Sequence, residues 1–365
     1  MPFANLHIHT HFSDGDISPD GLMRNIYAVK DLDYFAVTDH DTLSAIEPVF
    51  RLQEKMGQQG VLPLKTFLPG IELSLREEAL DLSIHLLGFF PHMTAQNHRR
   101  VLESLEQNLG PFCRYRCLHR GVTDMEARIH RAFEVNLESI REHYTSPDQV
   151  IALLNDRARA QNDARFQGAE KKGDVIQHPI PVTYQIIMDH WASLMPHSSK
   201  EKAALYILRR SSNRIEGLCT LYEKEGLPPE EAGIRADKNQ AVLTQYKRPP
   251  LKEWGPVEGL ELLKQAGGVA VLAHPAVDHT RISYEDFDHY VLRPMMKNGL
   301  DGIEVYYPYP SNYRDEAMKR YGGIAEKNGL LISGGTDYHG DGRVGLDDVK
   351  LQISNARHII QYERK

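Results

Sequence analysis

The sequence predicts an α/β barrel of about seven strands that is interrupted by a long helical insertion. Short apolar strands alternate with helical patterns near both ends of the chain, and this alternation stops between residues 94 and 250. Repeated strand–helix units favour parallel pairing, and closure into a barrel leaves no edge strand exposed. We therefore assign residues 1–93 and 251–365 to the barrel, and residues 94–250 to an insertion expected to cap it.

The barrel elements follow from apolar runs and helix-start signals. Ser18-Pro19-Asp20 is typical of a helix start and precedes a helical pattern through Lys30. Further helices are expected at residues 42–57, 256–266, 284–297 and 311–328. The expected strands are residues 3–9, 34–38, 66–73, 83–89, 269–273, 302–306 and 330–333.

The insertion shows helical periodicity instead of strands. Apolar residues recur at helical spacing over residues 129–144 and 205–222. Residues 112–250 contain 21 Lys and Arg against 18 Asp and Glu, a balance of +3 that would suit an anionic substrate. Solvated helix faces explain most such charges equally well.

Composition excludes several classes of protein. The chain has 365 residues, 41% of them hydrophobic and 25% charged, as expected for a globular protein. Its net charge of −7 argues against binding of duplex DNA. Because no secretory leader or apolar membrane run is present, we expect a cytoplasmic protein without a membrane partner. Three cysteines are too few for a disulfide framework, and Cys113 and Cys117 are expected to be buried apolar thiols. The oligomeric state stays open.

Histidine and acidic residues gather at the predicted strand ends. His7 and His9 lie two apart on a strand, so both imidazoles point to the same face. Further candidates of this kind are Asp14, His40, Glu72, His85, His274, Asp337 and His339. A single Asp or His at a strand end usually has a structural role. Nine of them at the rim where barrels keep their active sites predict a metal centre.

These motifs resemble those of the PHP family, named for polymerase and histidinol phosphatase. The matching segments are His-x-His-Thr-x-x-Ser-Asp-Gly at 7–15, Thr-Asp-His-Asp at 38–41, Gly-x-Glu at 70–72, Ala-His-Pro at 273–275 and Gly-Thr-Asp-x-His at 335–339. They cover the barrel portions and leave the insertion unmatched. The resemblance implies a distorted seven-stranded (β/α) barrel.

The resemblance also implies two or three divalent transition-metal ions, which would be Zn, Mn or Fe. Their ligand groups would be His7, His9, Glu72 and Asp337; Glu72, His85 and His274; and Asp14, His40 and His339. Glu72 would bridge the first two groups. Mixed imidazole and carboxylate ligands suit these metals better than Mg.

Such a centre implies hydrolysis of a phosphate ester by a metal-bridged hydroxide. Residues 302–307 and 334–337 look most like the stand-alone nucleotidase and oligonucleotide-phosphatase branch. We expect a phosphomonoester of a nucleotide, or of a similar small anion, as substrate. A cyclic phosphate, an oligonucleotide, a sugar phosphate and histidinol phosphate are the alternatives. A non-catalytic regulatory PHP module and an amidohydrolase on a similar barrel are further hypotheses, which the nine filled positions and the motif order disfavour.

Other residues are candidates for roles around the metals. Asp41 is the candidate catalytic residue, which would contact substrate or protonate the leaving group. Asp39 is expected to orient His40 or a nearby backbone amide. The run Tyr306–Pro310 would stack on a substrate ring or pack the rim. Substrate phosphate is expected to be bound by arginines of the insertion, namely Arg114, Arg116, Arg120, Arg209, Arg210 and Arg214.

Overall fold

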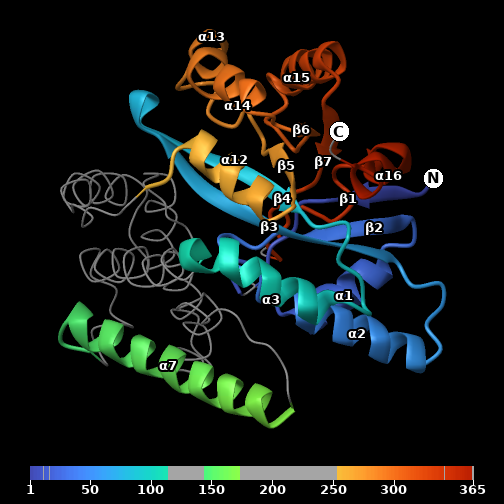
Figure 1. Ribbon diagram of the computed structural model, residues 1–365, viewed down its shortest axis with the longest axis vertical. Coiled ribbons are helices and arrows are strands. Elements are labelled where there is room, and N and C mark those ends of the chain that lie inside the picture. Colours follow the sequence, from blue (N-terminus) through green and yellow to red (C-terminus); the bar gives the residue numbers. More distant parts are fainter. Residues whose placement is uncertain (11, 16, 114–143, 173–252, 341, 364–365) are drawn as a thin grey trace, which may run out of the picture. The chain divides into compact units, whose positions relative to one another are not determined.

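The computed structural model of the chain describes residues 1–10, 12–15, 17–113, 144–172, 253–340 and 342–363 (Figure 1). The chain divides into two compact units. One comprises Met1–Arg114, Lys172–His178 and Lys252–Lys365, and the other comprises Tyr115–Lys171 and Pro179–Leu251. Nearly all of helix α7 (Pro147–Lys172) belongs to the second unit. The first unit carries the sheet and every candidate metal ligand.

The amino-terminal part of the first unit alternates strand and helix. Its elements are β1 (Phe3–Asn5), α1 (Pro19–Ala28), β2 (Leu32–Val37) and α2 (Ile46–Gln58). The side chain of Ser18 accepts a hydrogen bond from the Gly21 amide at 3.2 Å, and Pro19 occupies the first turn, as the sequence indicated. Helix α2 begins four residues later than expected, because residues 42–45 form the turn that leaves the rim.

The next two strands form a hairpin. Strand β3 (Thr66–Glu77) is followed by the short turn η1 (Glu78–Leu80) and then by β4 (Leu82–Phe89). Strand β4 pairs antiparallel with both β3 and β5 (Val269–Leu272). Our expectation of parallel pairing throughout was therefore wrong here. The reason is the connection, since η1 and the left-handed Asp81 (φ 51°) are far too short for a parallel crossover.

The carboxyl-terminal part resumes the alternation. Its elements are α12 (Pro256–Gln265), β5, α13 (Tyr284–Phe287), the π-helical turn η3 (Asp288–Leu292), α14 (Arg293–Lys297), β6 (Gly302–Tyr306), α15 (Arg314–Asn328), β7 (Leu331–Gly334), β8 (Leu351–Gln352) and α16 (Ile353–Ile360). The single helix predicted over residues 284–297 is divided by η3. Pro294 has no amide hydrogen to donate to the preceding turn, which accounts for the irregular ladder.

The eight strands form one sheet in the order β7-β6-β5-β4-β3-β2-β1-β8. The predicted count was seven, and the additional strand is the two-residue β8, antiparallel to β1 and too short to stand out in the sequence. The chain next to β1 pairs directly with the end of β7 and the segment after it. The Leu6 amide donates a hydrogen bond of 3.0 Å to the Gly334 carbonyl, and Ile8 forms a parallel bridge with Tyr338. The sheet is thus a nearly closed barrel, and the predicted α/β barrel fold is confirmed.

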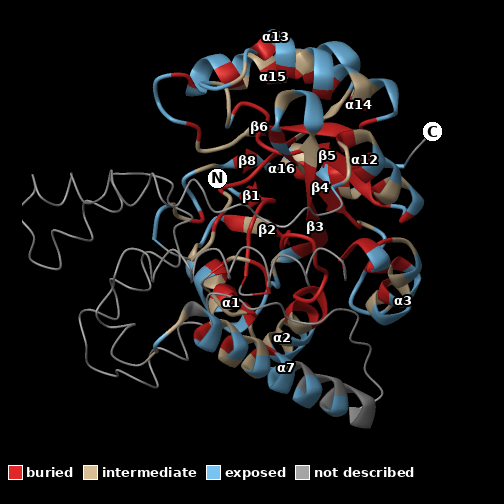
Figure 2. Ribbon diagram, turned by 90° about the vertical axis from the view of Figure 1, so that its left-hand side faces the viewer, coloured by how far each residue is buried: buried red, intermediate tan, exposed pale blue. Residues whose placement is uncertain are grey.

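Helices cover the outside of this sheet, and the buried residues concentrate in the strands between them (Figure 2). Leu6, Ala36, Leu87, Phe89 and Val271 belong to one buried apolar cluster that draws on successive strands. Helix α3 (His98–Asn108) belongs to the same compact unit as the barrel, although our predicted insertion begins at residue 94. In the described part of the chain, no helix combines the length and apolar character needed to span a membrane.

Most of the predicted insertion lies outside the described residues. This holds for the expected helices over 129–144, apart from Tyr144, and over 205–222. It also holds for all six arginines proposed to bind substrate. The capping role of the insertion therefore stays a prediction.

Candidate metal centre

The nine predicted ligands come from the strands of the barrel and from the segments that follow them. His7, His9 and Asp14 follow β1, and His40 follows β2. Glu72 lies in β3 and His85 in β4. His274 follows β5, whereas Asp337 and His339 follow β7. His40 forms an isolated bridge with Glu72, so the rim continues the order of the sheet. The fold thereby brings side chains from distant parts of the sequence to one rim.

The first group consists of His7, His9, Glu72 and Asp337. The Nε2 atoms of His7 and His9 are 3.1 Å apart, and each lies 3.1 Å from Oε2 of Glu72. Asp337 Oδ1 lies 3.0 Å from His9 Nε2 and 3.4 Å from His7 Nε2. Four donor atoms therefore converge on one point, and their role as ligands stays a prediction.

Glu72 also reaches a second group with its other oxygen. Its Oε1 lies 3.0 Å from His85 Nδ1 and 3.3 Å from His274 Nε2, and these two nitrogens are 3.3 Å apart. His40 Nδ1 approaches Glu72 Oε2 at 3.3 Å. The fully buried Glu72 is thus the side chain on which the two groups meet.

The third group centres on Asp14. Its Oδ1 lies 3.4 Å from His339 Nε2, and its Oδ2 lies 3.7 Å from His40 Nε2. His9 presents Nδ1 to Asp14 Oδ1 at 3.5 Å, so His9 faces the first group with one nitrogen and the third group with the other. These separations are looser than those around Glu72.

Backbone geometry at this rim is unusual. Asp41, His274 and Asp337 have φ angles of 57°, 25° and 52°, in the left-handed region that non-glycine residues rarely occupy. Gly335 sits against the backbone of His7, where a Cβ atom would come within 2.5 Å of the His7 nitrogen. Strained residues held by their surroundings are typical of functional sites.

Two residues beside the ligands fix their surroundings. Asp39 accepts hydrogen bonds from the Thr10 amide at 2.6 Å, the Thr10 hydroxyl at 2.7 Å and the Ser13 hydroxyl at 2.7 Å. It therefore shapes the turn that carries Asp14, and of the two expected roles, orienting His40 or holding a nearby backbone amide, the second is confirmed. The hydroxyl of Tyr307 donates to Asp337 Oδ2 at 3.0 Å, and its ring lies 5.0 Å from that of His274.

Sequence reasoning missed Glu304 altogether. This carboxylate is fully buried on β6, and its Oε1 lies 3.0 Å from His7 Nδ1. Only the unusual presence of an acidic residue in a short apolar strand, Gly302-Ile303-Glu304-Val305, could have signalled it.

Asp41, the predicted catalytic residue, is buried at the edge of the rim. Its Oδ1 accepts a hydrogen bond of 2.7 Å from the Ser74 amide, and its own amide donates to the Glu72 carbonyl at 2.8 Å. These contacts tie the segment after β2 to β3. A catalytic role for Asp41 stays a prediction.

The electrostatics of the rim favour cations. Burial lowers the pKa of His9, but the hydrogen bonds that its ring donates to Asp337 and Glu72, together with their charges, outweigh burial and raise the pKa to about 10. Burial raises the pKa of Glu72 and of Asp337, yet the surrounding histidines hold both well below their usual range. Glu72 and Asp337 are therefore charged, and in the chain alone the raised pKa values of His7, His9, His274 and His339 favour protons that balance them.

The donor set fits divalent metal ions. Ligand atoms about 2.1 Å from a tetrahedral ion stand roughly 3.4 Å apart. The donor atoms around Glu72 are separated by 3.0 to 3.3 Å. Imidazole nitrogens mixed with carboxylate oxygens are ligands for Zn, Mn or Fe rather than for Mg. Metal ions at these positions would replace the protons that the histidines otherwise hold.

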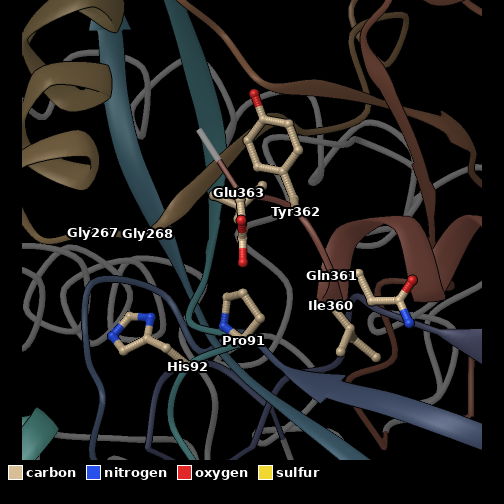
Figure 3. Close-up of a pocket in the computed structure, with 9 residues that line it drawn as sticks. Pro91, His92, Gly267, Gly268, Ile360, Gln361, Tyr362 and Glu363 are labelled. Atoms are coloured by element: carbon tan, nitrogen blue, oxygen red, sulfur yellow. The ribbon is translucent and has the colours of Figure 1, made fainter. Parts of the chain in front are cut away.

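A separate cavity lies at the other end of the barrel. It has a volume of about 370 Å³ and is lined by His92, Gly268 and Glu363 among others (Figure 3). Gly268 precedes β5 and His274 follows it, so the strand separates this cavity from the metal rim. None of the nine candidate ligands lines it.

The fold and the rim together define an α/β barrel with a candidate polynuclear metal centre. Comparison with solved structures supports the fold. One similar structure is that of a protein from Bifidobacterium adolescentis ATCC 15703, which is inferred to be a metal-dependent phosphoesterase. Its sequence is 22% identical to this chain, the TM-score is 0.53, and the match covers 98% of this chain and 96% of that one. At this identity the likeness concerns the fold alone.

Two further structures are more distant. An amidohydrolase from Chromobacterium violaceum with bound sulfate and no metal is 17% identical with a TM-score of 0.48, covering 98% of this chain and 96% of that one. A two-domain protein from Bacteroides vulgatus ATCC 8482, which contains a predicted PHP-like metal-dependent phosphoesterase, is 13% identical with a TM-score of 0.34, covering 93% of this chain and 52% of that one. No family model and no curated protein matches the sequence.

Proposed function

We propose that the protein is a metal-dependent phosphoester hydrolase of the PHP type. The observation that carries this proposal is the convergence of nine histidine, aspartate and glutamate side chains at one rim, with Glu72 facing one group through each of its oxygens. The fold it shares with the Bifidobacterium adolescentis protein supports the proposal. The nine residues would hold two or three divalent ions.

Charge at the rim favours phosphate as the group acted upon. The histidines would coordinate as neutral imidazoles, so only Asp14, Glu72 and Asp337 would offset the charge of the ions, and the pocket would stay positive. Divalent ions in such a pocket supply Lewis acidity and make a water-derived nucleophile available near neutral pH. His7, His9 and Glu72 of the first group are buried, and a site with little bulk water strengthens these interactions.

The substrate we propose is a phosphomonoester of a nucleotide or of a similar small anion. Tyr307 is partly exposed at the rim with its ring beside His274, so it offers a face for a base or sugar. Asp41 is proposed to contact the substrate or to protonate the leaving group. The six arginines of the insertion are proposed to grip the part of the substrate that does not react.

The test begins with protein purified without chelator, whose Zn, Mn and Fe contents are measured. The protein is then stripped, reloaded with each metal, and assayed on mononucleotides, short oligonucleotides, sugar phosphates, histidinol phosphate and cyclic phosphates, with amides as a second class of substrate. We expect metal-dependent phosphate release, fastest from a small phosphomonoester. Fully loaded protein that releases no phosphate would indicate a non-catalytic module, and turnover of amides alone would indicate an amidohydrolase.

A further inference from the structure

Glu304 lies behind the first group of candidate ligands. It follows Ile303 on β6. Because Ile303 pairs with Leu272, the last residue of β5, Glu304 lies beside the point where β5 ends and the segment with His274 begins. The side chain is fully buried, and its carboxylate belongs to none of the three ligand groups. A buried carboxylate at this place needs partners, and it has two.

The first partner is the far nitrogen of the His7 ring. His7 Nδ1 lies 3.0 Å from Oε1 and 3.2 Å from Oε2 of Glu304, while His7 Nε2 faces His9 and Glu72. An ionised carboxylate only accepts hydrogen bonds, so Nδ1 must carry the proton. Nε2 then has its lone pair available for a metal.

The second partner is the backbone of His274. Its amide donates to Glu304 Oε2 at 2.9 Å, and this residue has the strained φ of 25°. A hydrogen bond to a carboxylate is among the stronger ones in proteins, and here it holds the backbone that aims the His274 ring at Glu72.

We propose that Glu304 is a positioning residue that sets the tautomer of His7 and the backbone of His274, and so couples the first ligand group to the second. The inference rests on the proposed metal centre and names a residue beyond its ligands. Glu72 also contacts both residues, through Nε2 of each ring, whereas Glu304 holds the far ring nitrogen of His7 and the backbone amide of His274.

The geometry makes glutamine an informative replacement. In Glu304→Gln the His274 amide requires the side-chain oxygen at the Oε2 position, which places the NH₂ group where Oε1 faced His7. That group donates, and it would stand closer to Nδ1 than the remaining oxygen does, at 3.0 Å against 3.2 Å, so it favours a His7 ring that accepts at Nδ1 and carries its proton on Nε2. The variant therefore keeps the size of the side chain and selects the wrong tautomer.

The test measures metal binding apart from catalysis. Zn²⁺ affinity is determined by competition with a chromophoric chelator for the wild type, Glu304→Gln and the control Glu326→Gln, an identical change on the exposed face of α15. We expect Glu304→Gln to weaken binding by about 10- to 100-fold, and Glu326→Gln to leave it unchanged. Equal affinity in all three proteins would overturn the inference, even if phosphoesterase activity is found. If Glu304→Gln weakens zinc binding and the wild type has no phosphoesterase activity, the inference about Glu304 is supported and only the proposed function is contradicted.

A second measurement does not depend on a variant of Glu304. Nitrogen-15 NMR of the zinc-loaded wild type, with the His7 signals assigned by their loss in His7→Asn, reports which ring nitrogen carries the proton. We expect a protonated Nδ1 and a metal-bound Nε2. A proton on Nε2 would contradict the role given to Glu304 whatever the variant does.

Discussion

The hydroxyl of Tyr307 donates a hydrogen bond of 3.0 Å to Oδ2 of Asp337. Burial and the charge of Asp337 raise the pKa of Tyr307 well above its usual value, so the phenol keeps the proton that it donates to Asp337. The bond occupies one oxygen of Asp337, and Oδ1 faces His7, His9 and, at 3.6 Å, His339.

Tyr307→Phe should therefore loosen Asp337 without removing a ligand. A hydrogen bond to a charged group contributes about 1.5–3 kcal/mol, so we expect the metal concentration for half-maximal activity to rise about tenfold or more. Tyr290→Phe, at an exposed tyrosine, is the matched control. An unchanged metal requirement would show that Asp337 is held in place without the phenol.

Glu72→Gln should be the most damaging single change among the nine candidate ligands. The substitution removes a charge that faces two groups at once, so both lose compensation for their ions. We expect turnover to fall by at least about 100-fold, with fewer metal ions per chain by elemental analysis. Glu78→Gln, on the exposed turn η1, should behave like the wild type. Wild-type metal content in Glu72→Gln would exclude the bridging role.

The metal-free protein should lose stability at both ends of the pH scale. The pKa of His9 is 6.5 in the unfolded chain and about 10 in the fold, so binding of a proton to His9 stabilises the fold. This contribution is complete below pH 6.5 and disappears as pH rises towards about 10. The lowered pKa values of Glu72 and Asp337 stabilise the fold above their unfolded values of 4.5 and 3.8, and this contribution is lost as pH falls. Melting temperature measured in chelator should therefore peak between these limits. A flat profile from pH 6.5 to 10 would argue against charged histidines at the rim.

Gly335→Ala should destabilise the fold, because its Cβ would come within 2.4 Å of the His7 Cβ. Such overpacking costs about 1–3 kcal/mol in the free energy of unfolding. Gly323→Ala, in α15, meets open space and should instead stabilise the helix by up to about 1 kcal/mol. Urea unfolding of both variants gives the comparison, and equal stabilities would show that the segment after β7 moves away from His7 without strain.

The positions of the candidate ligands at the rim could be predicted, because the ends of barrel strands meet at one rim. His7 and His9 share a face by the strand period of two, and His40 and His274 follow apolar runs that are recognisable as strands. The antiparallel pairing of β3 with β4 was not predicted, although both strands were. Its only sign in the sequence is the short connection, which consists of the three residues of η1 and Asp81. Glu304 was missed because its partners lie 297 and 30 residues away, at distances along the chain that no local pattern encodes.

The closing contacts between Leu6 and Gly334, and between Ile8 and Tyr338, have a consequence for biosynthesis. His7 and His9 are made early and must wait for Asp337 and His339, more than 300 residues later, before their group is complete. A ribosome adding about 5–20 residues per second would leave the two histidines without these partners for at least about 15 seconds. The centre thus depends on contacts of very high sequence separation, which form late and slowly in folding. Metal that arrives before the barrel closes would find only part of the final ligand set.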